Sequence, residues 1–370
     1  MLRHPYNGVF FCLIEITMNN KILVTGGAGY IGSHTCLALH QAGYDIVVYD
    51  NLSNSSYEAV KRVSKLVGQP IEFIEGDVRD GKLLRQIFDK HQFFGVIHFA
   101  GLKAVGESVA KPLMYYNNNV SGTITLLEVM AEYNVDNFVF SSSATVYGDP
   151  EILPIDETSP RSCTNPYGQS KLTVERILED LAISYENWNL ITLRYFNPVG
   201  AHSSGQIGED PNDIPNNLMP YISQVAVGKL AKLSIFGDDY PTVDGTGIRD
   251  FIHVTDLAQG HVAALTYLEQ QTSPTGFLPI NLGTGKGTSV LELVSAFTEV
   301  TRQPIPYQFS ARRAGDIASC YASVDKAKSL LGWEAKLSIT DMCKDTWRWQ
   351  SMNPKGYYID SSDRQLSNQI

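Results

Sequence analysis

A glycine-rich segment near the start of the chain constrains the fold more than any other feature. Residues 25–32 read TGGAGYIG and follow directly after the short apolar run 21–24. That run has the composition of a strand buried on both faces. The glycines allow a tight turn, a close approach of the backbone to a ligand, and close packing of the next helix on the strand. The segment therefore predicts a strand, a turn and a helix (31–42) whose first amides face a diphosphate group.

The residues that follow indicate which dinucleotide would bind. A second apolar run (44–49) ends at Asp50. Asp50 lies about 20 residues beyond the glycines, where a carboxylate accepts the ribose hydroxyls of an adenosine. A free carboxylate at this place repels a 2′-phosphate, so the pattern favours NAD over NADP. A glycine triplet alone is often only a turn, but together with both strands and Asp50 it predicts an NAD-binding domain.

Strand-like and helix-like segments alternate through the first half of the chain. Further expected strands are 71–75, 95–99, 138–142 and 190–195, and expected helices include 81–91, 120–133 and 167–184. This alternation predicts an α/β fold with a doubly wound parallel sheet of the Rossmann type. In such sheets ligands bind beyond the carboxyl ends of the strands, where Asp50, Asp77, Ala100 and Ser143 would gather.

Differences in local amino-acid composition divide the chain into four parts. Residues 1–17 read as a disordered extension or a misassigned start before Met18, because they make a poor signal peptide. Residues 18–196 form the expected NAD-binding domain. Proline, glycine and asparagine are dense just after residue 197, and 197–357 are expected to form a smaller substrate-binding lobe, partly interwoven with the first domain. The polar end, 358–370, reads as a disordered tail.

Composition argues against several classes of protein. The formal net charge is −10, which disfavours general binding to nucleic acids or anionic membranes. No apolar stretch reaches the ~20 residues that a membrane-spanning helix needs. The cysteines are scattered without a C-x-x-C pair, and no spacing of metal-ligating residues suggests a metal site. A reducing cytoplasm is therefore the expected location.

Tyr167 and Lys171 carry the expected chemistry. They lie one helical turn apart in the string YGQSK, so their side chains share one face of a helix. A tyrosine ordinarily ionises near pH ~10. A neighbouring lysine, together with a positive nicotinamide ring, would lower this pKa and make Tyr167 a general base near neutral pH. Ser143, at the end of a predicted strand, would form a hydrogen bond to the same substrate oxygen.

These features together resemble the short-chain dehydrogenase/reductase superfamily, in its extended branch that acts on nucleotide sugars. The resemblance is closest to the UDP-glucose 4-epimerase (UDP-galactose 4-epimerase) family and covers about residues 21–357. It is carried by the strings TGGAGYIGSHT, FAGLKAVGES, FSSSATVYG, NPYGQSK, LRYFNPVGAH, IPNNLMPY and DGTGIRDFIHV. It implies reversible 4-epimerisation of UDP-glucose and UDP-galactose through a 4-keto sugar, with tightly bound NAD.

The resemblance also assigns residues to the cofactor. They lie in the glycine turn, after the following strands and around the reactive pair. The implied set is Gly26, Gly29, Tyr30, Ile31, Gly32, Asp50, Asn51, Leu52, Ser53, Asn54, Ser55, Asp77, Val78, Phe99, Ala100, Gly101, Leu102, Lys103, Asn118, Ser143, Tyr167, Lys171 and Phe196. Lys171 would hold the nicotinamide ribose in addition to supporting Tyr167.

Most implied substrate contacts come from the second half of the chain. The set is Ser143, Tyr167, Asn197, Asn217, Leu218, Phe236, Arg249, Arg313, Asp316 and Cys320. Arg249 and Arg313 would clamp the diphosphate, since planar guanidinium groups suit phosphate oxygens. Cys320 would lie beside the sugar, where some relatives have a bulky tyrosine, so UDP-GlcNAc and UDP-GalNAc are expected substrates as well. A shift of one residue in this comparison would place Tyr321 there and reverse that expectation.

Three other functions stay open at this point. A nucleotide-sugar 4,6-dehydratase would carry a Thr-Asp-Glu run where this chain has Ser143, Ala144 and Thr145, and a decarboxylase fits the second-half strings less well. A non-catalytic NAD-sensing protein usually lacks the reactive tyrosine or lysine. Release of bound NAD and turnover of UDP-galactose would separate these possibilities.

Apolar stripes on two of the expected helices bear on assembly. One stripe, on 167–184, consists of Val174, Ile177, Leu178 and Leu181, and the other lies on 120–133. In relatives these helices pair with their copies in a four-helix interface, which implies a homodimer. The same stripes would also serve to cover the parallel sheet.

Overall fold

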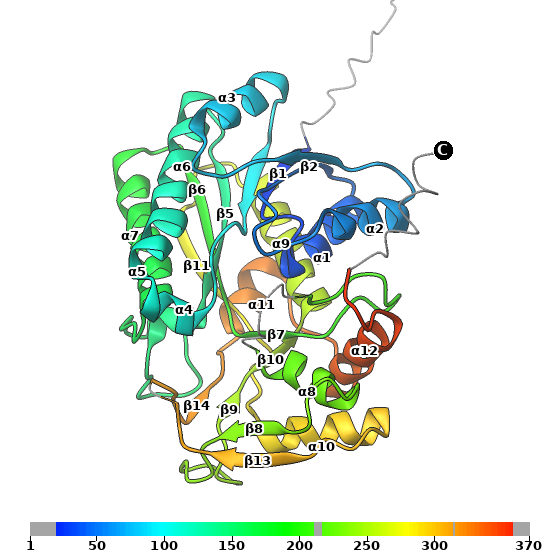
Figure 1. The fold of residues 1–370 in the computed structure, drawn as a ribbon. Helices are drawn as coiled ribbons and strands as arrows, with labels where there is room; N and C mark the ends of the chain where they lie inside the picture. Colours follow the sequence, from blue (N-terminus) through cyan, green and yellow to red (C-terminus); the bar gives the residue numbers. More distant parts are fainter. Residues whose placement is uncertain (1–19, 211–216, 314, 358–370) are drawn as a thin grey trace, which may run out of the picture.

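A seven-stranded parallel sheet forms the upper part of the molecule (Figure 1). The computed structural model describes residues 20–210, 217–313 and 315–357, so the predicted extension 1–17 and tail 358–370 lie outside the described residues. The strand order is β11-β6-β5-β4-β1-β2-β3. The strands are β1 (Lys21–Thr25), β2 (Asp45–Asp50), β3 (Glu72–Glu75), β4 (Gly95–His98), β5 (Asn137–Ser143), β6 (Asn189–Tyr195) and β11 (Gly276–Leu282). The doubly wound Rossmann-type sheet predicted from the sequence is confirmed.

Helices cover both faces of this sheet. Ile22 and Val24 of β1 pack in one apolar cluster and Leu23 in the other, because successive strand residues point to opposite faces. The first cluster receives residues from α1 (Tyr30–Gln41), α2 (Tyr57–Val67), α9 (Val254–Glu269) and α11 (Asp325–Leu331). The second receives residues from α3 (Gly81–Lys90), α6 (Gly122–Glu132) and α7 (Pro166–Ser184). Two covered faces explain why the strands read as continuous apolar runs.

The local structure departs from the sequence expectation in one helix. Residues 120–133 were expected to form a single helix, but α6 begins only at Gly122, after the π-helical turn η1 (Tyr116–Ser121). The short helices α4 (Val105–Ala110) and α5 (Pro112–Tyr115) precede that turn. A 3-10 turn, η2 (Ala144–Tyr147), follows β5. Single π-helical turns are frequent at functional sites, and η1 lies against α7.

Most of the chain after β6 forms a smaller body below the sheet in the view of Figure 1. Its elements are β7 (Asn197–Val199), α8 (Leu218–Ala226), β8 (Leu233–Phe236), β9 (Ile248–Arg249), β10 (Phe251–His253), β12 (Thr288–Ser289), α10 (Val290–Thr301), β13 (Tyr307–Ser310), β14 (Ser319–Cys320) and α12 (Ile339–Met352). A separate apolar cluster, which includes Ile222, Phe251 and Phe297, forms its core. The elements α9, β11 and α11 return to the large sheet.

The parallel strands bring their carboxyl ends to one edge of the sheet. Thr25 of β1 pairs with Tyr49 of β2 on one side and with His98 of β4 on the other. Ser143, the last residue of β5, pairs with Tyr195 of β6. The loops that follow these strands therefore start from the same edge, which faces the smaller body.

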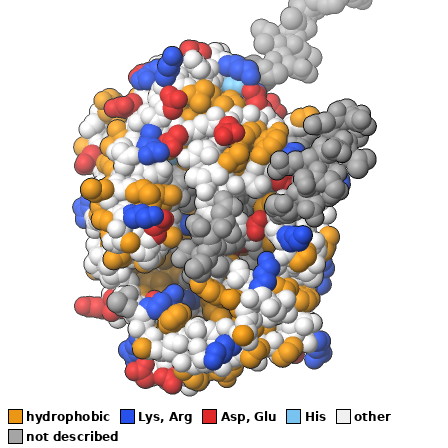
Figure 2. All heavy atoms as spheres, in the orientation of Figure 1, with side chains coloured by type: hydrophobic (Ala, Val, Ile, Leu, Met, Phe, Trp, Pro, Cys, Tyr) orange, Lys and Arg blue, Asp and Glu red, His pale blue; other side chains and the backbone are white. Residues whose placement is uncertain are grey.

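The visible surface carries basic and acidic side chains side by side, with hydrophobic ones between them (Figure 2). Within the described part of the chain, no helix is both long enough and apolar enough to cross a bilayer.

Candidate active site

The glycine turn after β1 has no space for side chains at two of its positions. Gly26 has φ +70°, and a Cβ at this position would lie 2.6 Å from the backbone nitrogen of Ala100. A Cβ on Gly32 would collide with the carbonyl of Gly26. Gly29 caps α1 without a side-chain hydrogen bond, and the first turn of the helix has no acidic residue. The amides at the start of α1 can therefore donate hydrogen bonds to an anionic group such as the diphosphate of NAD.

Asp50 connects this turn to the next loop. Its Oδ2 accepts a hydrogen bond from the Ala28 amide at 3.0 Å, and its Oδ1 accepts from Leu52 N at 2.9 Å and Ser55 Oγ at 2.8 Å. Burial raises the pKa of this carboxyl, against the lowering effect of these hydrogen bonds. A carboxylate has about four lone-pair directions, of which three are used here. Asp50 can thus still accept a ribose hydroxyl.

The loop after β2 and the end of β3 lie side by side. Asn51 Nδ2 donates to Asp77 Oδ2 at 3.0 Å, and Ser53 N donates to Asn51 Oδ1 at 3.1 Å. Leu52 has φ +56° in this tight turn, which also contains Asn54. Asp77 is held by Arg79 at 2.6 Å, and this hydrogen-bonded pair keeps the pKa of Asp77 well below its usual range. Val78, next to Asp77, is buried.

Residues 99–103 run from the end of β4 towards α7. Phe99 N donates to Thr25 O, so this segment starts beside the glycine turn. Asn119, in η1, accepts from Leu102 N at 2.8 Å and donates from Nδ2 to Leu102 O at 3.0 Å and to Ser170 Oγ at 3.0 Å. Asn118 Nδ2 in turn donates to Asn119 Oδ1. This network fixes the predicted cofactor loop against the helix that carries the reactive pair.

The reactive pair lies where β5 meets α7. Asn165 caps α7 by accepting from Gly168 N at 2.9 Å, and Pro166 opens the helix. Lys171 is buried, and its Nζ donates to the carbonyl of Ser141 at 2.7 Å. A Cβ on Gly101 would lie 3.5 Å from that Nζ. Lys171 therefore contacts both the end of β5 and the predicted cofactor loop.

The pKa of Tyr167 differs from the sequence expectation. Burial raises this pKa, while a hydrogen bond with Ser143 acts in the opposite direction. Burial also lowers the pKa of Lys171 to about 8, against the charge of Glu175, which raises it. The lowered pKa of Tyr167 expected from the sequence is thus not a property of the protein alone.

Two groups of predicted substrate residues form in the smaller body. In the first, β9 and β14 pair so that Arg249 is opposite Cys320. In the second, the Arg313 guanidinium lies 4.7 Å from the centre of the Phe236 ring, and its Nε donates to Asp316 Oδ2 at 2.9 Å. The charges of Arg249, Arg313 and Asp316 all act on the hydroxyl of Tyr240, which places them in one region.

Cys320 connects these groups to the reactive pair. It is 8% exposed and belongs to an apolar cluster with Ala144, Leu172 and Phe196. Ala144 directly follows Ser143, and Leu172 directly follows Lys171. Asn197, in β7, donates its amide to the Asp250 carbonyl at 2.9 Å. The smaller body therefore meets the carboxyl edge of the sheet at the predicted catalytic residues.

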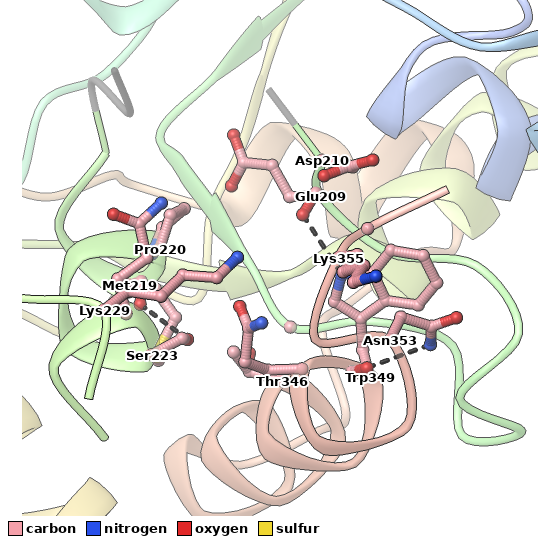
Figure 3. A pocket seen from close by; sticks show the side chains of 14 residues that line it. Glu209, Asp210, Met219, Pro220, Ser223, Lys229, Thr346, Trp349, Asn353 and Lys355 are labelled. Atoms are coloured by element: carbon pink, nitrogen blue, oxygen red, sulfur yellow. Dashed lines mark hydrogen bonds between the residues drawn. The ribbon is translucent and has the colours of Figure 1, made fainter. Parts of the chain in front are cut away.

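Glu209 connects a predicted cofactor residue, Lys103, to a predicted substrate residue, Asn217. Its Oε1 accepts from Lys103 Nζ at 3.1 Å and from Asn217 Nδ2 at 3.0 Å, just before Leu218 begins α8. Figure 3 shows Glu209 at the rim of a cavity between α8 and α12, with Trp349 Nε1 donating to its carbonyl. The residues that line this cavity do not include Ser143, Tyr167 or Lys171. The cavity therefore adjoins the candidate site without containing its reactive groups.

Sequence reasoning missed three residues that organise this site. Asn119 stands in an Asn-Asn-Asn run, in which Asn118 was chosen instead. Glu209 lies in the string GED, shortly before the IPNNLMPY string. Glu175 stands between the apolar residues Val174 and Leu178 on α7, and an acidic residue in an apolar stripe is itself a signal of a buried charge.

Comparison with known proteins agrees with this geometry. The model of the NAD dependent epimerase/dehydratase family matches residues 22–283. The UDP-glucose 4-epimerase of Bacillus subtilis is 60% identical over 336 residues, which cover 91% of this chain and 98% of that protein. The crystal structure of UDP-glucose 4-epimerase from Bifidobacterium longum in complex with NAD+ and UDP is 52% identical, with a TM-score of 0.87 over 91% of this chain and 99% of that one.

A second similar structure is named for two substrates. The UDP-Glc/GlcNAc 4-epimerase of Campylobacter jejuni is 37% identical, with a TM-score of 0.78, and the match covers 90% of this chain and 99% of that one. The match to the family model and these identities extend over most of the chain. The chain therefore belongs to the NAD dependent epimerase/dehydratase family and, within it, to the UDP-glucose 4-epimerases.

Proposed function

We propose that this enzyme interconverts UDP-glucose and UDP-galactose with Tyr167, Lys171 and Ser143 as its catalytic residues. The observation that carries the assignment is the meeting of Tyr167 and Lys171 on α7 with the end of β5 and with Gly101. Bound NAD supplies the acceptor and donor of hydride for carbon 4 of the sugar. Tyr167 takes the proton of the 4-hydroxyl and returns it to the other epimer. Ser143 holds the same oxygen, and Lys171 supports the tyrosine and the nicotinamide ribose.

The residues around the carboxyl edge account for the two ligands separately. The amides of α1, Asp50 and the segment 99–103 are proposed to hold NAD. Arg249 and Arg313 are proposed to hold the UDP diphosphate, with Asp316 at the uridine ribose and the backbone of Phe236 at the uracil. Epimerisation requires a firm hold on UDP while the sugar turns over, so most polar contacts are expected at the nucleotide.

The alternative functions are less well supported. The chain has Ala144 and Thr145 where a 4,6-dehydratase needs an acid/base pair, and Ala144 is packed in an apolar cluster. A non-catalytic NAD sensor would not need Lys171 in its buried position beneath the loop 99–103. Relatives that share more than half of their aligned residues with this chain are named UDP-glucose 4-epimerases.

The decisive experiment uses the purified protein without added cofactor. Denaturation should release NAD, and native protein mixed with UDP-galactose should form UDP-glucose with no added oxidant. Formation of a 4-keto-6-deoxy sugar would instead identify a dehydratase. Released NAD without any turnover would leave the binding protein as the better description.

Cys320 is expected to widen the range of substrates. Successive strand residues point to opposite sides, and Cys320 packs with Ala144 and Phe196, whereas the Tyr321 ring lies near Gly287. This arrangement supports Cys320 as the residue beside the sugar. A cysteine leaves space that a phenol ring would fill, so wild type should also interconvert UDP-GlcNAc and UDP-GalNAc. The Campylobacter relative bears both substrates in its name.

The corresponding test is a comparison of wild type with Cys320→Tyr on both pairs of sugars. The variant should lose activity on the N-acetyl sugars by ~10-fold or more, because a few missing or added heavy atoms in a pocket change selectivity by that order. Activity on UDP-galactose should fall much less. Equal treatment of both sugar pairs by the variant would show that Cys320 does not control access.

A homodimer is proposed from a different set of apolar residues than the sequence indicated. Val174 and Leu178 are fully buried against the sheet, so this part of the predicted stripe covers the core. Large apolar side chains are instead exposed on α4 and α5, which adjoin α7: Val109 at 64% and Leu113 at 82%. Hydrophobic side chains are also seen at the left of Figure 2, the side on which α4, α5 and α7 lie in Figure 1. Such a surface fits a second copy of the chain.

Light scattering at micromolar concentration should give the mass of two chains. The variant Leu113→Glu should shift the protein towards the monomer, because it places a charge on the proposed contact surface. The exposed Val243, on the smaller body, provides a matched control as Val243→Glu. A monomeric wild type would rule out the dimer.

The cytoplasm is the proposed location. The cysteines that the structure describes are free thiols, namely Cys36, Cys163, Cys320 and Cys343. Free thiols are typical of reducing compartments. Recovery of the native protein in a membrane or secreted fraction of the source cells would contradict this assignment.

A further inference from the structure

A buried ion pair joins α7, the helix that carries Tyr167 and Lys171, to the sheet. Glu175 stands on α7 one turn after Lys171 and two turns after Tyr167, and its side chain is 0% exposed. Arg194 on β6 is 1% exposed. Arg194 Nε donates to Glu175 Oε1 at 3.0 Å, and Nη2 donates to Oε2 at 2.7 Å. This two-point geometry fixes the carboxylate in position and orientation.

The remaining polar atoms of the pair are also bound. Ser142 Oγ, on β5, donates to Glu175 Oε1 at 2.6 Å. Arg194 Nη1 donates to the Tyr147 hydroxyl at 2.8 Å, and that hydroxyl donates to Asn281 Oδ1 at 2.6 Å. The network therefore joins α7 to β5, β6, β11 and η2. Figure 1 shows α7 alongside this part of the sheet.

The network reaches the catalytic groups on two sides. Ser142 and Ser141 are neighbours in β5: one binds Glu175 through its hydroxyl, and the other binds Lys171 through its carbonyl. Ser143, which follows them, forms the hydrogen bond with Tyr167. A displacement of Glu175 would therefore move both the helix that carries Tyr167 and Lys171 and the strand that carries Ser143.

A buried ion pair is poorly explained by stability alone. Removing two charges from water costs about as much as their attraction returns, and well-packed apolar replacements are often neutral or stabilising. Glu175 also lies one helical turn from a buried lysine whose role requires a proton, and it acts to raise the pKa of that lysine. A role in catalysis explains both its position and its charge.

We propose that Glu175, held by Arg194, is a positioning residue for the epimerisation reaction: it fixes α7 against β5 and keeps Lys171 protonated. This inference rests on the proposed function of Tyr167 and Lys171. Lys171 in turn supports the phenolate of Tyr167 only while it carries its positive charge. Because its side chain is fully buried against Arg194, Glu175 acts through α7 and Lys171.

Several other charged or titratable groups face Lys171 or Glu175 and contribute to the pH dependence of this pair. Lys171 faces His98 on β4 as well as Glu175. Glu175 faces Arg194, Tyr147, Cys163 and Arg161, whose Nη1 lies 3.3 Å from Oε2. Arg161 is shared with Glu179, which lies one turn further along α7. Among the groups around Lys171, Glu175 is the one whose charge favours the protonated lysine.

The test uses the NAD-loaded enzyme and two variants. Glu175→Gln retains the shape of the side chain and removes its charge, but leaves Arg194 buried and unpaired. The double variant Glu175→Gln with Arg194→Met removes both charges, so it keeps the test open if the single variant fails to fold. Glu179→Gln is the matched control, since it removes a carboxylate from the same helix without touching Arg194.

Two measurements decide the outcome. The first is the pH profile of kcat: its alkaline limb should move about one pH unit lower in Glu175→Gln and less in the double variant, while KM for UDP-galactose stays unchanged. The second is the pKa of Lys171 from the NMR titration of its ε-carbon, which should fall in the same order. Glu179→Gln should behave as wild type in both.

The failure of the inference differs from a failure of the proposed function. An active wild type, with a folded double variant that has the wild-type pH profile and the wild-type Lys171 pKa, would show that the pair is only structural. An inactive wild type would overturn the epimerase function. The NMR titration would then still show whether Glu175 holds the proton on Lys171.

Discussion

Replacing Tyr167 with phenylalanine is expected to lower kcat by ~10²-fold or more while NAD stays bound. The substitution deletes only the hydroxyl, and the ring still fills its place beside Ser143. Without the hydroxyl, the neighbouring Lys171 cannot replace it as the base, because its protonated amine, which donates to the Ser141 carbonyl, has no acceptor site. Initial rates with UDP-galactose and the NAD released on denaturation measure the two halves of this expectation.

A matched control comes from the other end of the same helix. Tyr185 follows α7 and is 57% exposed, so Tyr185→Phe also removes a hydroxyl but should change neither turnover nor NAD content. A Tyr167→Phe variant with near-normal kcat would refute the assignment of the proton-transfer residue. A variant that loses NAD would instead show that the hydroxyl serves mainly to hold the cofactor.

The fold could be predicted because its signals are local. In β1, Ile22, Leu23 and Val24 are all apolar because both faces of the sheet are covered, and Gly26, which follows the strand, is required by a backbone approach to Ala100. Such requirements leave direct traces in a short stretch of sequence. The π-helical turn η1 leaves no comparable trace, because its hydrogen bonds depend on packing against α7.

The candidate site was predictable to a smaller extent, for the same physical reason. Asp50, Tyr167 and Lys171 stand at fixed distances from recognisable motifs. The partners of Asn119 and Glu209 come from distant segments, such as Ser170 and Lys103, and no spacing in the sequence reveals them. The pKa of Tyr167 is set by burial, which likewise depends on the assembled structure.

Three buried histidines are expected to make the folded state sensitive to acid. Burial lowers the pKa of His34 to about 3, that of His98 to about 3 and that of His261 to about 4. The ring nitrogens of His98 lie 2.6 Å from Thr25 Oγ1 and 2.9 Å from Thr123 Oγ1. The Thr123 hydroxyl donates to Asn119 O, so it accepts from His98, and the neutral ring satisfies both of its nitrogens. His261 is likewise engaged at both nitrogens, with Leu257 O and the Tyr195 hydroxyl.

These lowered values determine the direction and range of the effect. A histidine in the unfolded chain takes up its proton near pH ~6.5, whereas the folded chain takes up these protons only near pH 3 to 4. The stabilising contribution is therefore complete above about pH 6.5 and is lost as the pH falls towards the folded pKa. In this range each such histidine lowers the free energy of unfolding by about 1.4 kcal/mol for each pH unit that the pH falls. All three together lower it by roughly 4 kcal/mol per unit. A typical domain has only about 5–15 kcal/mol of stability.

The expected result is a steep fall in the free energy of unfolding between about pH 6 and pH 4.5, measured by urea titration with NAD present in excess. Carboxyl groups with raised pKa values, such as Asp50 and Asp250, oppose this fall as they gain protons. The difference in the free energy of unfolding between wild type and His98→Asn does not contain the contribution of these carboxyl groups, because both proteins have them. That difference should shrink by about 1.4 kcal/mol for each pH unit below 6, since the variant has one buried imidazole fewer to keep neutral. A difference that is constant from pH 7 to pH 4.5 would show that His98 does not resist protonation in the folded enzyme.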